Sequence, residues 1–230
     1  MKEKVILAWS GGKDSAMALY ALLTGGQYNV VSLLTTICEQ YGRISHHGVR
    51  VGLLKQQAEA LGMPLHEVYL PQANCSIEDY EAVMEKVMLE YKEKGVLTVA
   101  FGDIFLPDLR EYRERNLAKV GAKAIFPIWH RDTTELVRAF IDLGFRAYLT
   151  CVDGEKLGRE FAGRPIDADL IRDLPDGVDP CGENGEFHSY VYDGPIFQRP
   201  VDLSVGEVVL RDVRYFADLV PMERQITKQV

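Results

Sequence analysis

The chain has 230 residues, 47% of them hydrophobic and 26% charged, a composition typical of globular proteins and not of disordered or fibrous ones. It is long enough to bury a core without disulfide bridges. The net charge of −8, with basic residues mixed among acidic ones, makes nucleic acid an unfavourable partner. No apolar run approaches the ~20 residues of a membrane-spanning helix, and the first residues do not resemble a signal peptide. We therefore expect a cytoplasmic protein without a membrane partner.

The four cysteines lie far apart in the sequence and form no Cys-x-x-Cys pair. No histidine stands at a zinc-ligand spacing from any of them. We therefore expect free thiols, with Cys151 and Cys181 buried as small apolar residues, and neither a structural zinc nor an iron–sulfur cluster.

Residues 1–127 alternate between short apolar segments and longer amphipathic ones. The apolar segments predict strands at residues 5–9, 29–36, 65–70 and 96–101. The amphipathic segments predict helices at residues 13–23, 49–61, 76–91 and 109–120. Residues 38–48 have no periodicity and predict a loop. Strands that alternate with helices indicate an α/β fold, a doubly wound parallel sheet with helices on both faces.

The pattern changes after Pro127. A helix is predicted at residues 132–143 and strands at 146–152, 187–192 and 207–216, around a Gly/Pro/Asp-rich stretch at 154–185. Long irregular segments inside a compact protein are usually functional. We expect two domains, residues 1–127 and a smaller α+β domain at residues 128–230.

One segment between the first predicted strand and the first predicted helix has the composition of an anion-binding loop. Two glycines allow a close approach of the backbone, and the amides of a helix N-terminus bind negative charge. Hydroxyls, an ammonium group and a carboxylate add donors and a possible Mg²⁺ ligand. The residues of the segment are Ser10, Gly11, Gly12, Lys13, Asp14 and Ser15. Its spacing fits neither G-x-x-x-x-G-K-[ST] nor G-x-G-x-x-G. The bland alternative is a plain turn with a solvated lysine.

This segment resembles the pyrophosphate-binding loop of the PP-loop ATP pyrophosphatases, which cleave ATP between the α and β phosphates. The resemblance implies a Rossmann-like domain of the adenine nucleotide alpha hydrolase type and ATP bound by residues 10–15. It also implies an adenylated substrate and released pyrophosphate. Lys13 and Asp14 are then expected to be catalytic, with Asp14 as a Mg²⁺ ligand.

Further stretches resemble the diphthine–ammonia ligase family, namely Phe101-Gly-Asp-Ile104 with Arg110 and Glu114 downstream, Ile128-Trp-His-Arg-Asp132, Leu157-Gly158 and Cys181-Gly-Glu-Asn-Gly-Glu-Phe187. The resemblance covers residues 4 to 200. It implies that Gly102 and Asp103 contact the nucleotide or its magnesium, and it implies a substrate site and two catalytic carboxylates in the second domain. The expected substrate-binding residues are His47, Arg110, Trp129, Arg131 and Gly185, and the carboxylates are Glu183 and Glu186.

Each of these residues also has a structural interpretation. Glu183 and Glu186 either hold ammonium, coordinate Mg²⁺ or form a solvated acidic turn. Asp103 lies at the carboxyl edge of the expected sheet, where ligands bind, but it could cap a loop. Arg110 can pair with Glu114 four residues later. Trp129 can be an interdomain packing residue, and Asp132 fits a helix cap.

The leading hypothesis is an ATP- and Mg²⁺-dependent ligase that adenylates a carboxylate and amidates it with free ammonia. The family resemblance implies diphthine on translation elongation factor 2 as the carboxylate. Two alternatives stay open, a PP-loop enzyme acting on another small molecule or on tRNA, and a nucleotide sensor without catalysis. A homodimer is also left open by the sequence.

Overall fold

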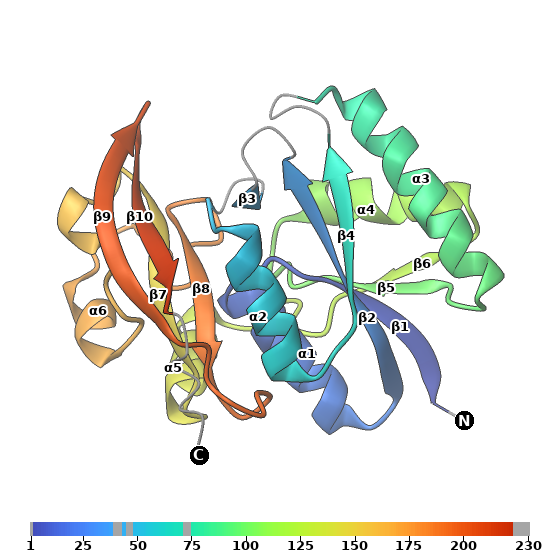
Figure 1. The fold of residues 1–230 in the computed structure, drawn as a ribbon, viewed down its shortest axis with the longest axis horizontal. Helices are drawn as coiled ribbons and strands as arrows, with labels where there is room; N and C mark the ends of the chain where they lie inside the picture. The colour runs from blue at the N-terminus through green and yellow to red at the C-terminus, as the bar shows by residue number, and fades with distance from the viewer. Residues whose placement is uncertain (1, 39–42, 45–47, 71–74, 223–230) are drawn as a thin grey trace, which may run out of the picture.

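The computed structural model describes residues 2–38, 43–44, 48–70 and 75–222, which form two β-sheets side by side (Figure 1). The first sheet has five parallel strands in the order β4-β2-β1-β5-β6. Their bounds are β1 (Glu3–Ala8), β2 (Tyr28–Cys38), β4 (Leu65–Leu70), β5 (Thr98–Ala100) and β6 (Lys123–Ile125). A two-residue strand β3 (Arg43–Ile44) runs antiparallel to the end of β2. The predicted α/β fold with a parallel sheet is confirmed.

Two pairs of helices cover the two faces of this sheet. Helices α1 (Lys13–Gly25) and α2 (Val51–Leu61) pack on one face, and α3 (Ile77–Glu93) and α4 (Pro107–Lys119) on the other. Strand β1 shows why both faces are apolar, because alternate side chains along a strand point in opposite directions. Val5 and Leu7 join the core on the α1/α2 side, and Ile6 joins the core on the α3/α4 side.

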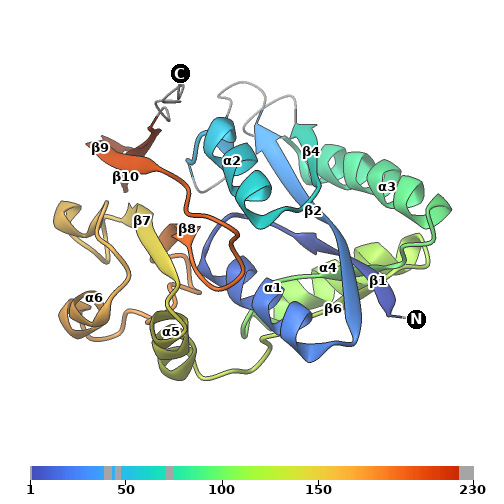
Figure 2. The same ribbon diagram turned by 60° about the horizontal axis from the view of Figure 1, so that its bottom comes forward.

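The second sheet is antiparallel, with the order β8-β7-β10-β9 (Figure 2). Its strands are β7 (Arg146–Asp153), β8 (Phe187–Asp193), β9 (Leu203–Arg211) and β10 (Arg214–Pro221). Helix α5 (Thr133–Asp142), the short helix η1 (Arg159–Phe161) and helix α6 (Ala168–Asp173) complete this part of the chain. The Asp132 carboxylate accepts a hydrogen bond from the Glu135 amide at 2.8 Å, so Asp132 is the expected cap of α5.

The structure corrects the sequence analysis in four places. The single strand predicted at residues 207–216 is wrong, because the chain turns between β9 and β10 at Asp212, whose φ is 53°. Aspartate tolerates this left-handed conformation better than most residues, so it supports a tight turn inside an apolar stretch. Strand β6 was not predicted, and the stretch at residues 154–185, expected to be irregular, contains η1 and α6. Part of the loop predicted at residues 38–48 forms β3.

One apolar core continues from α1 and α2 into the second sheet. Tyr190 of β8 is fully buried in it, and its hydroxyl donates a hydrogen bond to the Leu53 carbonyl of α2 at 2.8 Å. This packing fixes β8 against the first part of the chain. Among the described residues, no helix is both long enough and apolar enough to cross a membrane. The division into domains at residue 127 stays a prediction.

Candidate active site

The segment at residues 10–15 lies at the point where the strand order of the first sheet reverses direction. From β1 the chain moves to β2 and β4 on one side and later returns to β5 and β6 on the other. The chain therefore leaves the carboxyl ends of β1 and β5 towards opposite faces of the sheet. The crevice between these two connections is the usual ligand site of doubly wound sheets. A cleft of about 370 Å³ opens here, lined by the loop, the ends of β2 and β5, helices α3 and α4, and residues 181–189.

The loop is held in shape by its own serines. The Gly12 amide donates to Ser10 Oγ at 3.2 Å, and Ser15 Oγ donates to the Gly12 carbonyl at 2.9 Å. Gly11 has a φ of 78°, a conformation that favours glycine. Gly12 then caps α1, so the first amides of this helix stand at the cleft. The backbone therefore has a glycine turn that leads into a helix N-terminus, and its role as an anion-binding loop stays a prediction.

Lys13 is almost fully buried, with a relative exposure of 1%. Burial alone would lower the pKa of Lys13, but the adjacent Asp14 carboxylate, which forms an ion pair with its Nζ, and the Cys181 thiol raise the pKa above its ordinary value. The ammonium group therefore stays charged inside the protein. Asp14 lines the cleft with its side chain 30% exposed. Lys13 and Asp14 together place a fixed positive charge and a carboxylate beside the loop.

Gly102 brings the end of β5 into direct contact with the loop. A Cβ atom at this position would lie 2.9 Å from the Asp14 carbonyl carbon and from the Ser15 nitrogen. Only a residue without a side chain fits such a close approach. Asp103 follows in the cleft lining, where Arg113 binds its two oxygens at 2.6 and 3.0 Å. The carboxylate of Asp103 is therefore neutralised by an arginine in this structure.

The described residues contain no cluster of three or more His, Cys, Asp or Glu side chains that could hold a metal ion. The two carboxylates expected to bind Mg²⁺ are each paired, Asp14 with Lys13 and Asp103 with Arg113. Mg²⁺ commonly takes most of its ligands from phosphate and water and only one or two from protein carboxylates. The loop fits this kind of Mg²⁺ binding, because Asp14 is partly exposed in the cleft and can supply one carboxylate ligand.

Glu183 faces the loop across the cleft. Its Oε1 accepts hydrogen bonds from the Ile104 amide at 2.7 Å and from the Phe105 amide at 3.4 Å. Burial raises the pKa of Glu183 to about 7, although the Ile104 amide acts in the opposite direction. The negative charges of Asp14 and Asp103 add to the increase. Near neutral pH this carboxyl group can therefore both accept and release a proton.

Glu186 has a different position, inside the loop that carries Glu183. It is buried, and its Oε1 accepts hydrogen bonds from the Asp179 amide at 3.2 Å and from the Asn184 side chain at 3.1 Å. Its second oxygen has no partner among the described residues, and Glu186 does not line the cleft. Gly185 does line it, and the Gly185 carbonyl accepts a hydrogen bond from Arg214 at 3.0 Å.

The other expected substrate residues lie outside the cleft lining. Arg110 forms an ion pair with Glu114 at 2.8 Å, which is the structural interpretation that the sequence offered for it. The Arg110 guanidinium lies 4.9 Å from the centre of the Trp129 ring. Arg131 is exposed and lies two residues after Trp129 in the sequence. A link to the cleft exists through the backbone, because the His130 amide donates to the Ile104 carbonyl at 2.7 Å. His47 lies outside the described residues.

Two buried polar residues beside the loop were missed by the sequence analysis. Gln57 of α2 has no exposed surface, and Ser189 of β8 is 5% exposed. A signal for Gln57 was present, because it lies four residues after Leu53 and therefore on the apolar face of its helix. No comparable signal marks Ser189 in the sequence.

Comparison with known proteins matches most of the chain to one family, the diphthamide synthases. A sequence model of the diphthamide synthase N-terminal domain matches residues 3–124, and one of the diphthamide synthase C-terminal domain matches residues 132–222. A diphthine–ammonia ligase of Danio rerio is 24% identical over 241 residues, 93% of this chain and 91% of the relative. The Homo sapiens protein of that name is 24% identical over 239 residues, 90% of this chain and 85% of the relative.

Proposed function

Because the chain belongs to the diphthamide synthase family, it is an ATP-dependent ligase, and we propose that it adenylates a carboxylate and then amidates it with ammonia. The proposed substrate is diphthine on translation elongation factor 2, by analogy with the relatives named diphthine–ammonia ligase. The observation that carries the proposal is one cleft in which the loop at residues 10–15 stands opposite Glu183.

In the first step, an oxygen of the substrate carboxylate attacks the α-phosphorus of ATP, and pyrophosphate leaves. Negative charge builds up on the leaving group, so donors that are already in position stabilise the transition state. The amides at the start of α1 and the Lys13 ammonium are the donors of this loop. Lys13 is suited to the role because Asp14 keeps it protonated despite its burial.

In the second step, ammonia attacks the acyl carbon, the amide forms and AMP leaves. Glu183 attracts ammonium by its charge, accepts one of its protons and thereby releases the nucleophile. A pKa of about 7 suits this exchange at neutral pH. Glu186 supports the step indirectly, because its carboxylate holds the Asp179 and Asn184 groups of the same loop.

Magnesium bound to the phosphates would neutralise their charge and assist the departure of pyrophosphate. Asp14 would supply a protein oxygen to that ion. The surface formed by Arg110, Trp129 and Arg131 would receive the protein substrate near the cleft. A cytoplasmic location and the two-domain division at residue 127 belong to the same proposal.

Analysis of the nucleotide products tests the proposal. Continued turnover of ATP to AMP and pyrophosphate should require both ammonium and the carboxylate substrate, whereas the carboxylate alone should give a single release of pyrophosphate. A diphthine-bearing elongation factor is the first substrate to try, with the factor before diphthine synthesis as the matched control. ADP as the main product, or turnover that ignores the carboxylate, would overturn the assignment. ATP bound but never consumed would favour the nucleotide-sensor alternative.

A further inference from the structure

We propose that the ATP site is completed by β8, with Ser189 binding the phosphates directly and Gln57 holding β8 and the loop together. This inference deepens the proposed function and depends only on its ATP-binding part. Neither residue belongs to the loop at residues 10–15 or to the segment at residues 181–187 that carries Glu183 and Glu186. Both are buried polar side chains, which are uncommon unless hydrogen-bonded.

The argument for Ser189 begins with its hydroxyl group. Ser189 Oγ accepts a hydrogen bond from the Lys13 amide at 3.1 Å, and Ser189 lines the cleft. A serine hydroxyl is one donor as well as an acceptor. Among the residues that the structure describes, the hydroxyl hydrogen has no hydrogen-bond acceptor. It is therefore free to donate to a phosphate oxygen at the start of α1.

The position of Lys13 in the helix makes this donor stronger. The Lys13 amide is one of the first amides of α1, which carry the positive end of the helix dipole. By donating to Ser189 Oγ, the amide polarises the hydroxyl, because hydrogen bonds in a chain strengthen one another. The Ser189 hydroxyl thus adds one hydrogen-bond donor for a phosphate to those of the N-terminal amides of α1.

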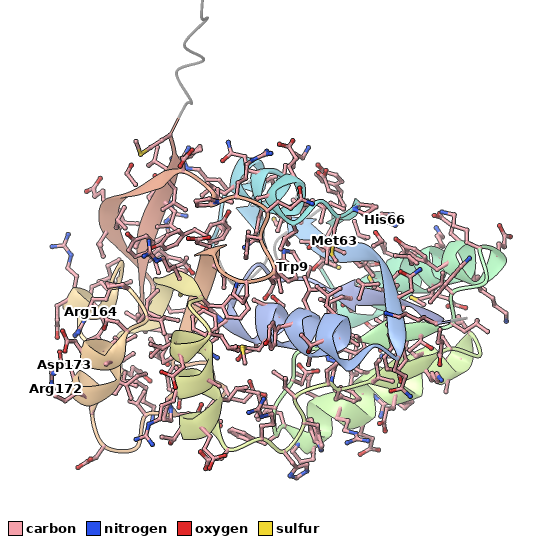
Figure 3. The ribbon with its side chains drawn as sticks, turned by 90° about the horizontal axis from the view of Figure 1, so that it is seen from below. Trp9, Met63, His66, Arg164, Arg172 and Asp173 are labelled. Atoms are coloured by element: carbon pink, nitrogen blue, oxygen red, sulfur yellow. The ribbon has the colours of Figure 1, made fainter. Side chains whose placement is uncertain are left out.

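Gln57 explains how β8 is kept at this position. Its Nε2 donates to the Gly11 carbonyl at 3.0 Å and to the Val191 carbonyl at 2.6 Å, so one amide group bridges the loop and β8. The Val191 amide also donates to the Gly11 carbonyl at 2.9 Å. Trp9, at the end of β1 and in the middle of the molecule (Figure 3), donates its indole N–H to Gln57 Oε1 at 2.8 Å.

The close fit at the loop leaves little freedom for β8 to move. A Cβ atom on Gly12 would lie 3.0 Å from the Ser189 carbonyl oxygen, and one on Gly11 would lie 2.7 Å from Gln57 Oε1. Loop, glutamine and strand therefore form one packed unit. Gln57 is a positioning residue in this arrangement, whereas Ser189 is a contact residue for ATP.

The first experiment measures ATP affinity by titration calorimetry with Mg²⁺ present and both other substrates absent. Ser189→Ala should weaken ATP binding roughly tenfold or more, as expected for a lost hydrogen bond to a charged group. Ser189→Thr keeps the hydroxyl and should retain most of the affinity. Ser32→Ala is the matched control, because Ser32 is a buried serine outside the cleft lining, where its hydroxyl contacts the Leu33 and Pro64 carbonyls and the Tyr91 side chain.

The second experiment tests Gln57 with Trp9 as the reporter. Trp129→Phe leaves Trp9 as the only tryptophan, since the chain has two. In that background Gln57→Met should weaken ATP binding and shift Trp9 emission to shorter wavelength, because the indole loses its acceptor. Gln56→Met, one residue away, is the control and should change neither. A purely structural role for Gln57 would lower thermal stability without moving the ATP affinity of the folded protein.

The outcomes separate this inference from the proposed function. Failure of the wild-type chain to bind ATP would remove the proposed function and the inference together. Normal ATP binding by wild type, with folded Ser189→Ala and Gln57→Met binding equally well, would overturn the inference alone. Weakened binding in both variants and unchanged binding in both controls would support it.

Discussion

Lys13 and Asp14 form an ion pair whose contribution to the stability of the protein depends on its burial. An ion pair on the surface contributes little because water screens it, whereas a buried charge that loses its partner is strongly unfavourable. Here Asp14 also lines the cleft that would hold a polyanion, whereas Lys13 is buried. Removing either residue therefore affects both ATP binding and the protonation of the other.

Lys13→Met should reduce ATP-dependent turnover roughly a hundred- to a thousandfold, by analogy with the removal of one positioned donor from an oxyanion hole. Methionine keeps the length and apolar stem of the side chain, so the fold should persist. The measurement is pyrophosphate release under saturating substrates, with circular dichroism as the check on folding. Lys86→Met, an exposed lysine of α3, is the control and should retain full activity.

Glu183 makes stability depend on pH in a direction that its pKa determines. Its pKa rises from 4.5 to about 7 on folding, so between these pH values the folded protein binds more protons at this site than the unfolded chain. The folded state is therefore favoured at low pH and loses this advantage as the pH rises towards 7. Above pH 7 Glu183 carries a half-buried negative charge, which lowers the stability of the folded state.

Glu183→Gln should consequently raise the melting temperature at pH 8 by a few degrees, about the effect of one or two kcal/mol in a chain of this size. Glutamine still offers an oxygen to the Ile104 amide but carries no charge. At pH 5, where Glu183 is mostly protonated, wild type and variant should melt at nearly the same temperature. Equal differences at both pH values would contradict the elevated pKa of Glu183.

At the scale of the elements, the loop depends on the end of β5 as much as on its own residues. Gly102 lets the two segments touch, and a side chain there would meet backbone atoms that cannot move aside. Gly52 offers a contrast, because it lies within α2 and a Cβ atom on it would meet nothing within 4 Å.

Gly102→Ala should therefore displace the loop and weaken ATP binding at least tenfold, with a loss of thermal stability. The same change at Gly52, in the first turn of α2, should raise stability by at most about 0.5–1 kcal/mol, because alanine loses less backbone entropy than glycine when a helix forms. Thermal unfolding and ATP titration on the two variants give the comparison. Tight ATP binding by Gly102→Ala would show that the loop tolerates movement of β5.

The elements that follow a strong local pattern could be predicted from the sequence. Ser76 caps α3 through the Asp79 amide at 3.1 Å, and Gly26 ends α1 with a φ of 70°. Strand β6 has only three residues and therefore too short a pattern to identify. The β9–β10 turn was hidden because a single left-handed aspartate replaces the usual glycine.

The candidate site was predictable only in part. The loop at residues 10–15 is contiguous, so its spacing identified it. Ser189 and Gln57 reach the same place through tertiary packing, which no local pattern describes. Glu183 and Glu186 look equivalent in sequence, yet one faces the cleft and the other faces into its own loop, because the turn between them reverses the backbone.

At the scale of the whole molecule, the two sheets share a core and the cleft proposed to bind ATP. ATP that contacts both the loop and β8 stabilises the arrangement of the two parts, not only the loop. A ligand that binds the folded state alone stabilises it by about 2.7 kcal/mol at a hundred times its dissociation constant.

We therefore expect ATP at that concentration to raise the melting temperature by about 5–10 °C, given 2–4 °C for each kcal/mol in chains of 150–250 residues. Calorimetry should show a single transition that moves as a whole. Two transitions, of which ATP shifts only one, would mean that the sheets unfold independently. The Ser189→Ala variant should show a smaller shift at the same ATP concentration.

The hydrogen bond between Gly11 and Val191 joins two residues that lie far apart in the sequence. A ribosome makes the loop early and β8 late, so the nucleotide site is incomplete for most of synthesis. A nascent or C-terminally truncated chain exposes the loop without Ser189 and without the bridge through Gln57. In the proposed binding mode, tight ATP binding thus requires synthesis as far as β8, and ATP in the cell would preferentially protect molecules that contain this strand from degradation.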